Sequence, residues 1–261
     1  MFVITEMRKM KILDLTAKNP IKDISNKLPQ TISTAEWHPR KPGKILCAAL
    51  SSSLLGDFGE VEPQLWLLDL ATKKKEIIYD LKNKEAPMDS NTEILSVVWN
   101  PGEDVFLVLT NNSDILLFTM DEAQPKMIFE KQAIGVTNVV WLDNVSGDFL
   151  TVSKKVGALR IWNASSPIPK RIIKLSNNGI LGVMPCQQDY FLFQLTTGSV
   201  LLYDLKSEKV RFQTDVCHTA QIQDCKVHPC NPDLMGTVSF DGSLRTWDLK
   251  SMKLEQIFTD R

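Results

Sequence analysis

The sequence predicts an all-β fold built from one module of four short strands that recurs along the chain. Three observations support this prediction. Apolar and polar residues alternate over short runs, which is the period of a strand, and helix-period patterns are absent. Turn residues such as Gly, Pro, Asn and Asp separate the runs. The runs also return in the same order several times within the 261 residues.

The first strand of each module is an alternating apolar segment, often closed by Trp and by a turn that contains Pro. Five segments fit this description: ISTAEWHP (32–39), ILSVVWNP (94–101), VTNVVWLD (136–143), ILGVMPCQ (180–187) and IQDCKVHP (222–229). Three of these strands end in Trp37, Trp99 and Trp141. We expect these indole rings to pack between neighbouring modules.

Three more strands follow in each module. The second is an apolar run that begins near residues 45, 104, 148, 190 and 234. The third reads QLWLLDL (64–70), DILLFTM (114–120), ALRIWNA (158–164), SVLLYDL (199–205) and SLRTWDL (243–249). The fourth begins near residues 75, 125, 170, 209 and 253. Four alternating strands in a row predict an antiparallel meander.

The spacing of the modules predicts a β-propeller. The third strands place an Asp or a related residue at Asp14, Asp69, Thr119, Asn163, Asp204 and Asp248, with successive differences of 55, 50, 44, 41 and 44. Four strands with a period of about 40 to 45 residues are typical of a propeller blade. We therefore predict a single propeller domain over residues 1–261, with blades at about 1–25 (partial), 31–81, 93–131, 135–175, 179–214 and 217–259.

The last module is the most complete, and it carries a family resemblance. Residues 217–249 read CHTAQIQDCKVHPCNPDLMGTVSFDGSLRTWDL, with a turn at Asp241-Gly242 where Gly tolerates positive φ. This unit resembles a WD repeat. The resemblance implies a structural hydrogen-bonded tetrad in which the matching residues are His218, Ser239, Asp241 and Trp247. The other modules lack a full set, since Leu68 and Phe118 stand where Trp is expected, so we expect them to rely on apolar packing.

The resemblance to the WD-repeat family is specific over about residues 90–261 and looser before them. It implies an all-β WD-repeat β-propeller with about six blades and four antiparallel strands per blade. Some long members of the family combine propellers with helical solenoids, a layout shared with vesicle-coat and ciliary-transport subunits. No catalytic activity and no cofactor are implied.

The N-terminal segment supplies only part of a blade. MFVIT, MKILDL and PIKDI fit a second, third and fourth strand, whereas WD-repeat propellers most often have seven blades. Three interpretations stay open. The sequence belongs to a longer protein with an incomplete seven-bladed ring here, it closes as a six-bladed ring, or a partner chain completes it.

Two chemical interpretations of the last module compete with a structural one. His218, Ser239 and Asp241 could suggest a hydrolytic triad, but Ser239 is expected within a strand and not on a strained turn. The segment 217–230 holds three Cys and two His, yet core and turn positions account for all of them without zinc. We therefore predict no catalytic residues, no metal site and no cofactor.

A long insertion is the best candidate for a partner-binding element. SSSLLGDFGEVEP (51–63) joins the second and third strands of the first full module, where other modules use only a few residues. It combines apolar and acidic side chains, and long loops of this kind often carry function. The candidate binding residues are Leu54, Leu55, Asp57, Phe58, Glu60 and Glu62. The alternative is a surface excursion that binds nothing.

The overall charge argues against nucleic acid as a partner. Thirty Lys and Arg nearly cancel thirty-one Asp and Glu, so no long-range field attracts a phosphate backbone or an anionic membrane. No apolar stretch is long enough to cross a bilayer, and MFVITEMRKMK does not resemble a signal peptide. An odd number of cysteines, five, favours a reducing compartment such as the cytoplasm.

These observations favour a non-enzymatic scaffold that displays loop faces to other proteins within a larger assembly. The alternative is a propeller-type enzyme with an active site at the central channel, which would gather ionisable residues there. A reader of phosphopeptides or ubiquitin would need a cluster of arginines, and the arginines are scattered among the modules. Association with cilia or coat-like assemblies rests on the family resemblance alone.

Overall fold

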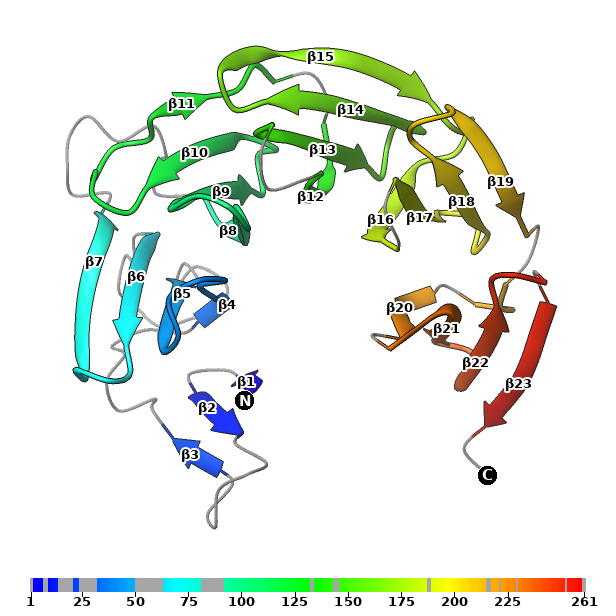
Figure 1. Ribbon diagram of the computed structural model, residues 1–261, viewed down its shortest axis with the longest axis horizontal. Helices are drawn as coiled ribbons and strands as arrows, with labels where there is room; N and C mark the ends of the chain where they lie inside the picture. The colour runs from blue at the N-terminus through cyan, green and yellow to red at the C-terminus, as the bar shows by residue number, and fades with distance from the viewer. Residues whose placement is uncertain are drawn as a thin grey trace. The chain divides into compact units, whose positions relative to one another are not determined.

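The structure of the protein is a computed structural model of residues 1–261. It describes residues 2–6, 9–13, 21–23, 32–49, 63–80, 92–131, 134–142, 146–186, 189–214, 217–220, 222–228, 230–251 and 253–259. All regular structure in these residues is β-strand (Figure 1). The prediction of an all-β fold is confirmed, because the alternating runs leave no segment with a helical apolar stripe.

The strands form one three-stranded sheet and five four-stranded sheets, each a meander in chain order. The three-stranded sheet contains β1 (Phe2–Glu6), β2 (Lys9–Leu13) and β3 (Ile21–Asp23). The next two contain β4 (Ile32–Trp37), β5 (Lys44–Ala49), β6 (Gln64–Asp69) and β7 (Lys74–Asp80), then β8 (Ile94–Trp99), β9 (Val105–Thr110), β10 (Ile115–Thr119) and β11 (Met127–Ile128). These sheets match the module order that the alternating runs predict.

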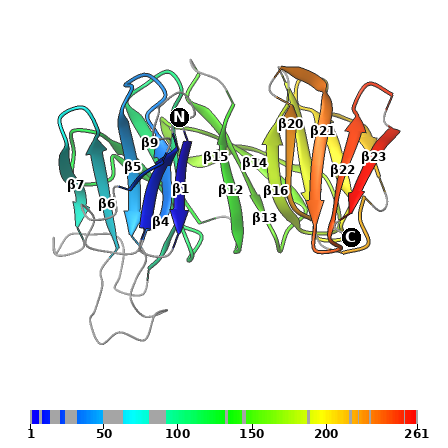
Figure 2. The ribbon, with the colours of Figure 1, turned by 90° about the horizontal axis from the view of Figure 1, so that it is seen from below.

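The remaining three sheets follow the same plan. They contain β12 (Val136–Trp141), β13 (Asp148–Ser153), β14 (Ala158–Asn163) and β15 (Ser166–Lys174), then β16 (Ile180–Pro185), β17 (Tyr190–Leu195), β18 (Val200–Asp204) and β19 (Lys209–Gln213), and last β20 (Ile222–His228), β21 (Asn231–Ser239), β22 (Ser243–Asp248) and β23 (Lys253–Thr259). Figure 2 shows β20 to β23 standing side by side. Short turns suffice because consecutive strands are neighbours.

The chain divides into two compact units. One comprises Met1–Gly135, Trp141–Leu150 and Ile161–Arg171, and the other comprises Val136–Val140, Thr151–Arg160 and Ile172–Arg261. In the first unit, one face of β5 and β6 and one face of β8 to β10 share a core that includes Leu46, Leu67, Trp99, Phe106 and Phe118. Trp99 thus lies between two sheets, as the sequence predicts for the residue that closes a first strand.

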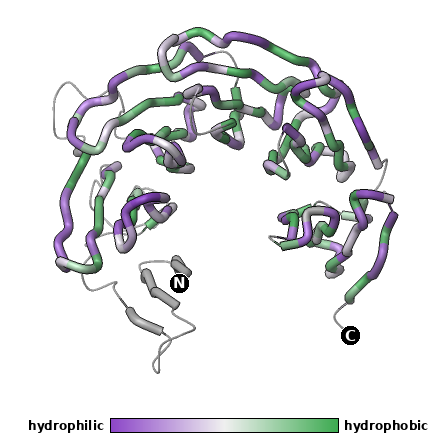
Figure 3. Tube along the Cα trace, in the orientation of Figure 1, coloured by the Kyte–Doolittle hydropathy of each residue, from purple (hydrophilic) through white to green (hydrophobic). Residues whose placement is uncertain are grey.

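The core of the second unit lies between β16–β19 and β20–β23. Leu192, Val200 and Leu202 from one sheet pack with Met235 and Trp247 from the other. Because side chains alternate between the two faces of a strand, residues two apart on β17 and β18, or on β21 and β22, point into this core. The outermost strands are more polar, and Figure 3 shows hydrophilic and hydrophobic residues mixed along β23. The candidate site lies on the buried face of this last sheet.

The turns that follow the first strands share one hydrogen-bonding scheme. The Nδ1 atom of His38 accepts from the amides of Arg40 and Lys41 at 3.1 and 3.0 Å. Asn100 does the same with Oδ1 for Gly102 and Glu103 at 2.7 and 2.9 Å. Because Pro lacks an N–H, the His or Asn before it can cap the two amides that follow. This explains why His-Pro and Asn-Pro recur at the end of these strands.

Candidate functional site

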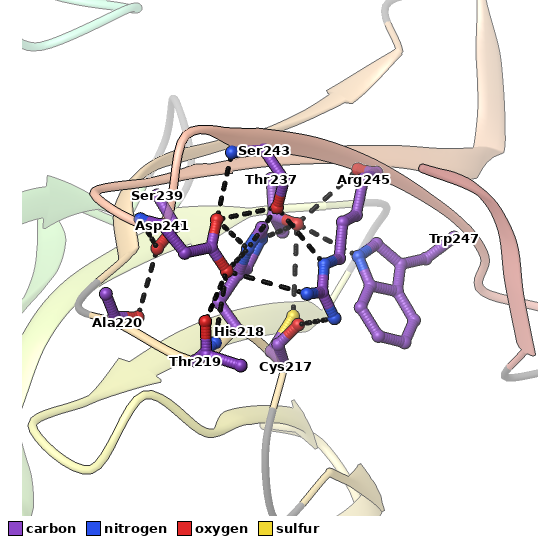
Figure 4. A network of polar contacts seen from close by, with 10 residues as sticks. All are labelled: Cys217, His218, Thr219, Ala220, Thr237, Ser239, Asp241, Ser243, Arg245 and Trp247. Atoms are coloured by element: carbon purple, nitrogen blue, oxygen red, sulfur yellow. Dashed lines mark hydrogen bonds and ion pairs between the residues drawn. The ribbon is translucent and has the colours of Figure 1, made fainter. Parts of the chain in front are cut away.

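The candidate site is a polar network on the hairpin of β21 and β22 and the segment before β20 (Figure 4). In the register of this hairpin, Met235 faces Trp247 and Thr237 faces Arg245. Side chains two residues apart share a face, so the alternating residues of both strands point into the same interior. Gly242 closes the hairpin with φ of +75°, a conformation that favours glycine.

Three hydrogen bonds form a continuous chain through the network. Trp247 donates from Nε1 to Oγ1 of Thr237 at 3.0 Å. Oγ1 of Thr237 lies 2.8 Å from Nε2 of His218, and Nδ1 of His218 lies 3.0 Å from Oδ2 of Asp241. An indole N–H can only donate, so the Thr237 hydroxyl proton is free to reach Nε2 and the His218 proton sits on Nδ1. One tautomer therefore satisfies every member of the chain.

Asp241 is the acceptor at the end of the chain. Its carboxylate also accepts from the Ser243 hydroxyl at 2.6 Å, the Ser243 amide at 2.9 Å and the Thr219 amide at 3.1 Å. The hydrogen bond from the Ser243 hydroxyl is the largest cause that holds the pKa of Asp241 well below its ordinary value, although desolvation opposes it. The carboxylate is thus kept charged and binds the hairpin turn to the segment before β20.

Ser239 does not occupy the relay position that the family resemblance implies. Its Oγ donates to the Ala220 carbonyl at 3.1 Å and accepts from the Asp241 amide at 3.1 Å. The relay between indole and imidazole is Thr237, two residues earlier on the same face of β21. The cause is the register: Trp247 lies opposite Met235, so its ring reaches the diagonal neighbour Thr237, whereas Ser239 pairs with Ile222 at the strand end.

Arg245 is a member of the network that sequence reasoning missed. It donates from Nη1 to the Cys217 carbonyl at 3.0 Å and from Nε to the Ser243 hydroxyl at 3.3 Å, and Nη2 lies 3.5 Å from Oδ2 of Asp241. The available signal was strand parity, since Arg245 stands two residues before Trp247 and must share its buried face.

The arrangement of Asp241, His218 and a hydroxyl has the connectivity of a hydrolytic triad. Its environment is different, however. Thr237 is 0% exposed and His218 is 2% exposed, and the Thr237 oxygen already accepts from Trp247. A nucleophile must present a free lone pair to a substrate, which this hydroxyl does not do. The geometry instead fastens residues 217–220 to the hairpin.

Cys217 and Cys225 of segment 217–230 lie in the core shared by the last two sheets, whereas His228 lies in a turn. Burial raises the pKa of Cys217 to about 11 and that of Cys225 to about 12, so both thiols stay protonated near neutral pH. His228 caps a turn by accepting at Nδ1 from the amides of Cys230 and Asn231. In the part of the chain that the structure describes, no three His, Cys, Asp or Glu side chains are grouped as metal ligands.

The predicted partner-binding residues Leu54, Leu55, Asp57, Phe58, Glu60 and Glu62 lie outside the described residues. Their role stays a prediction. The described residues contain no helix with the length and hydrophobicity needed to span a membrane.

Comparison with known proteins identifies the fold. No protein-family profile matches the chain. The structure is similar to a chain in the crystal structure of the mitotic checkpoint complex, with a TM-score of 0.75 over 99% of this chain and 76% of the other. The chain has the fold of a WD-repeat β-propeller. Only 11% of the aligned residues are identical, so the likeness concerns the fold alone.

Proposed function

We propose that this WD-repeat propeller is a non-enzymatic scaffold that binds other proteins. The observation that carries the proposal is the buried state of its most reactive-looking residues. His218 and Thr237 are buried and Asp241 is partly buried, and the three form one hydrogen-bonded chain with Trp247 that stabilises a blade. A rigid framework that holds exposed loops and strands in fixed positions is suited to recognition.

Exposed side chains on the outermost strands support the proposal that the propeller binds other proteins. Apolar side chains are exposed on the outer strands of several sheets, namely Ile77, Ile128, Ile168, Ile172, Val210 and Ile257. Exposed apolar groups surrounded by charged neighbours are typical of protein interfaces. Lys75, Lys170 and Lys209 lie on three of these strands, so contacts there would combine burial with salt-dependent attraction.

We further propose that the partners belong to a larger assembly in a reducing compartment such as the cytoplasm. The five cysteines are free, which agrees with that environment. Residues 156–175 and 217–249 resemble the first propeller region of WD repeat-containing protein 17. One solved structure of similar fold is itself a chain of a protein complex. Proteins are the proposed partners, not nucleic acid, and no insertion into membranes is proposed.

Proximity labelling of the tagged chain in cells tests the proposal. The key variant replaces Leu54, Leu55 and Phe58 with Ser, and the matched control replaces exposed Glu122 in a turn between β10 and β11 with Ser. Specific neighbours should be lost with the first variant and kept with the second, while both keep the parental melting temperature. If the wild type and both variants label the same neighbours, residues 51–63 do not bind the partners.

The scaffold proposal itself has a separate test. The purified chain is incubated with active-site-directed hydrolase probes, and labelling is followed with and without an excess of unlabelled competitor. Saturable labelling of the folded chain would contradict the scaffold proposal and favour the channel-site enzyme.

A further inference from the structure

Two turns at one end of the sheet β4–β7 concentrate positive charge. Residues 38–44 connect β4 to β5, and residues 69–74 connect β6 to β7. The Leu70 amide donates to the Gly43 carbonyl at 2.9 Å, so the two turns lie side by side. We name them the basic turns, because they hold five cations and one carboxylate: Arg40, Lys41, Lys44, Lys73, Lys74 and Asp69.

Each basic turn is held in place by a side chain that caps backbone amides. His38 caps the first turn through its Nδ1 atom. Asp69 caps the second, since its Oδ1 atom accepts from the amides of Ala71 and Thr72 at 2.9 and 3.1 Å. The one carboxylate of the basic turns is therefore used within its own turn. A backbone that is fixed before binding lowers the entropy cost of recognition.

The lysines of the basic turns are accessible. The strand register places Lys44, Asp69 and Lys74 side by side across β5, β6 and β7. Lys73 and Lys74 are exposed, and Lys44 is partly exposed. Neither Lys73 nor Lys74 forms an ion pair with a carboxylate in the part of the chain that the structure describes. Positive charge that is gathered in this way attracts an anionic group.

The neighbouring sheet β8–β11 carries the opposite charge beside the basic turns. Its turns 100–105 and 120–126 hold four carboxylates and one cation: Glu103, Asp104, Asp121, Glu122 and Lys126. Arg40 and Lys41 each reach across to Asp104 at 2.5 Å, and their side chains remain 47% and 42% exposed. The basic surface therefore ends at this boundary, and an anion that extends past it meets carboxylates.

We propose that the basic turns bind a short acidic segment of a partner protein. The inference rests on the scaffold proposal and adds the chemistry of a partner. A short run of Asp or Glu covers the basic turns and ends before the acidic ones. Nucleic acid carries a phosphate at every nucleotide, and an anionic membrane is a broad surface, so both would bring negative charge onto the acidic turns. Such repulsion selects against the wrong partner.

Fluorescence anisotropy of a labelled peptide with a run of about six Glu, titrated with the full chain, tests the proposal. We expect saturable binding that weakens about ten-fold between about 50 and 300 mM salt, because exposed charges are screened. Lys73→Glu combined with Lys74→Glu should weaken binding about ten-fold or more at the lower salt concentration. Glu208 occupies the position of Lys73 in the turn between β18 and β19, with φ of +55° against +59°, so this backbone accepts Glu.

Lys206→Glu combined with Lys250→Glu is the matched control. These exposed lysines lie in the corresponding turns of two other sheets, and the control changes the net charge by the same amount. It should leave the affinity for the peptide within about two-fold of the wild type. The milder variant Lys74→Gln should weaken binding about two- to three-fold. All variants are checked for unchanged thermal unfolding.

Three outcomes overturn the proposal. The first is the absence of saturable binding of the peptide, and the second is an equal loss of binding in the two double variants. The third is tighter binding of a single-stranded DNA of about twelve nucleotides, or of vesicles that contain phosphatidylserine, that is lost when Lys73 and Lys74 are replaced. That result would assign the basic turns to nucleic acid or to a membrane surface. None of these results bears on the hydrolase-probe test of the scaffold proposal.

Discussion

The sheets β8–β11 and β20–β23 fill corresponding interior positions with different kinds of side chain. Phe118 and Val108 of the first correspond to Trp247 and Thr237 of the second, as the strand registers show. Around Phe118, the Phe106 ring stacks with centroids 5.5 Å apart and the Tyr79 ring approaches edge-on at 5.5 Å. Around Trp247, a chain of hydrogen bonds replaces the aromatic stack.

The difference shows when a polar interior is favourable in this fold. A buried hydroxyl or imidazole costs free energy unless it finds a partner, so a polar set must be complete or absent. The last sheet has the complete set. The sheet β8–β11 has Val108 in place of Thr237 and therefore an apolar environment. Apolar packing tolerates changes of detail, whereas the hydrogen-bonded chain fixes one arrangement of residues 217–220.

The largest expected effect is that of Trp247→Ala. The variant loses a buried ring and leaves Thr237 without its donor, so we expect a loss of about 3–5 kcal/mol in the free energy of unfolding. Urea unfolding followed by circular dichroism measures it. Trp247→Phe keeps most of the packing and should lose only about 1–2 kcal/mol. If Trp247→Ala unfolds at the wild-type urea concentration, the network does not stabilise the blade.

The second prediction concerns Thr237 and Val108, which occupy corresponding positions in the two sheets. Thr237→Val keeps the shape but removes both hydrogen bonds of the relay, and Val108→Thr introduces a hydroxyl into an apolar core. We expect each change to cost about 1–3 kcal/mol by the same measurement, for opposite reasons. A stabilised Thr237→Val variant would mean that the complete polar set has no advantage over an apolar one.

Ser239→Ala is the control that separates the two hydroxyls of β21. Ser239 bonds the turn and the Ala220 carbonyl but touches neither the indole nor the imidazole. We expect a cost below that of Thr237→Val, about 0.5–1 kcal/mol. The reverse order would restore Ser239 as the relay.

Much of the fold could be predicted from the sequence because it depends on period. Alternating runs, turn residues and a spacing near 44 residues are local or repetitive features that need no register. The site was harder. His218, Asp241 and Trp247 were found through the family resemblance, but Thr237 and Ser239 share one face of β21, and parity alone cannot choose between them.

The choice depends on the pairing of β20, β21 and β22, which includes irregularities that no local rule supplies. The register between β20 and β21 shifts near Ile222 and again near Val227. Such a shift decides which hydroxyl lies within reach of the imidazole. Arg245 could have been found from strand parity, because it stands two residues before Trp247 on the same face of β22.

The third prediction concerns the carboxylate at the end of the polar chain. Because the pKa of Asp241 is held below its ordinary value, its ionised form stabilises the folded state above about pH 4, and this stability is lost as the pH falls further. Asp241→Asn should cost about 1–2 kcal/mol at pH 7 and should flatten the loss of stability below pH 4. Urea unfolding at pH 7, 4 and 3 checks both parts. An unchanged slope would locate the acid sensitivity elsewhere.

The fourth prediction concerns a carboxyl with the opposite environment. Glu36 of β4 is largely desolvated and accepts one hydrogen bond, from the Trp99 amide at 2.9 Å, and desolvation raises its pKa to about 7. The folded state therefore binds a proton more tightly than the unfolded chain, and stability falls as the pH rises from about 4.5 to 7.

Glu36→Gln should remove this fall, because the amide oxygen can still accept from Trp99 and carries no charge. At pH 8 the variant should be more stable than the wild type by about 1 kcal/mol, while at pH 4.5 the two should be nearly equal. Urea unfolding at the two pH values measures the difference. A variant that is less stable at pH 8 would mean that the ionised carboxylate of Glu36 is fully compensated, as that of Asp241 is. One backbone donor and the surroundings of Glu36 would then compensate its charge as well as the several donors around Asp241 compensate that carboxylate.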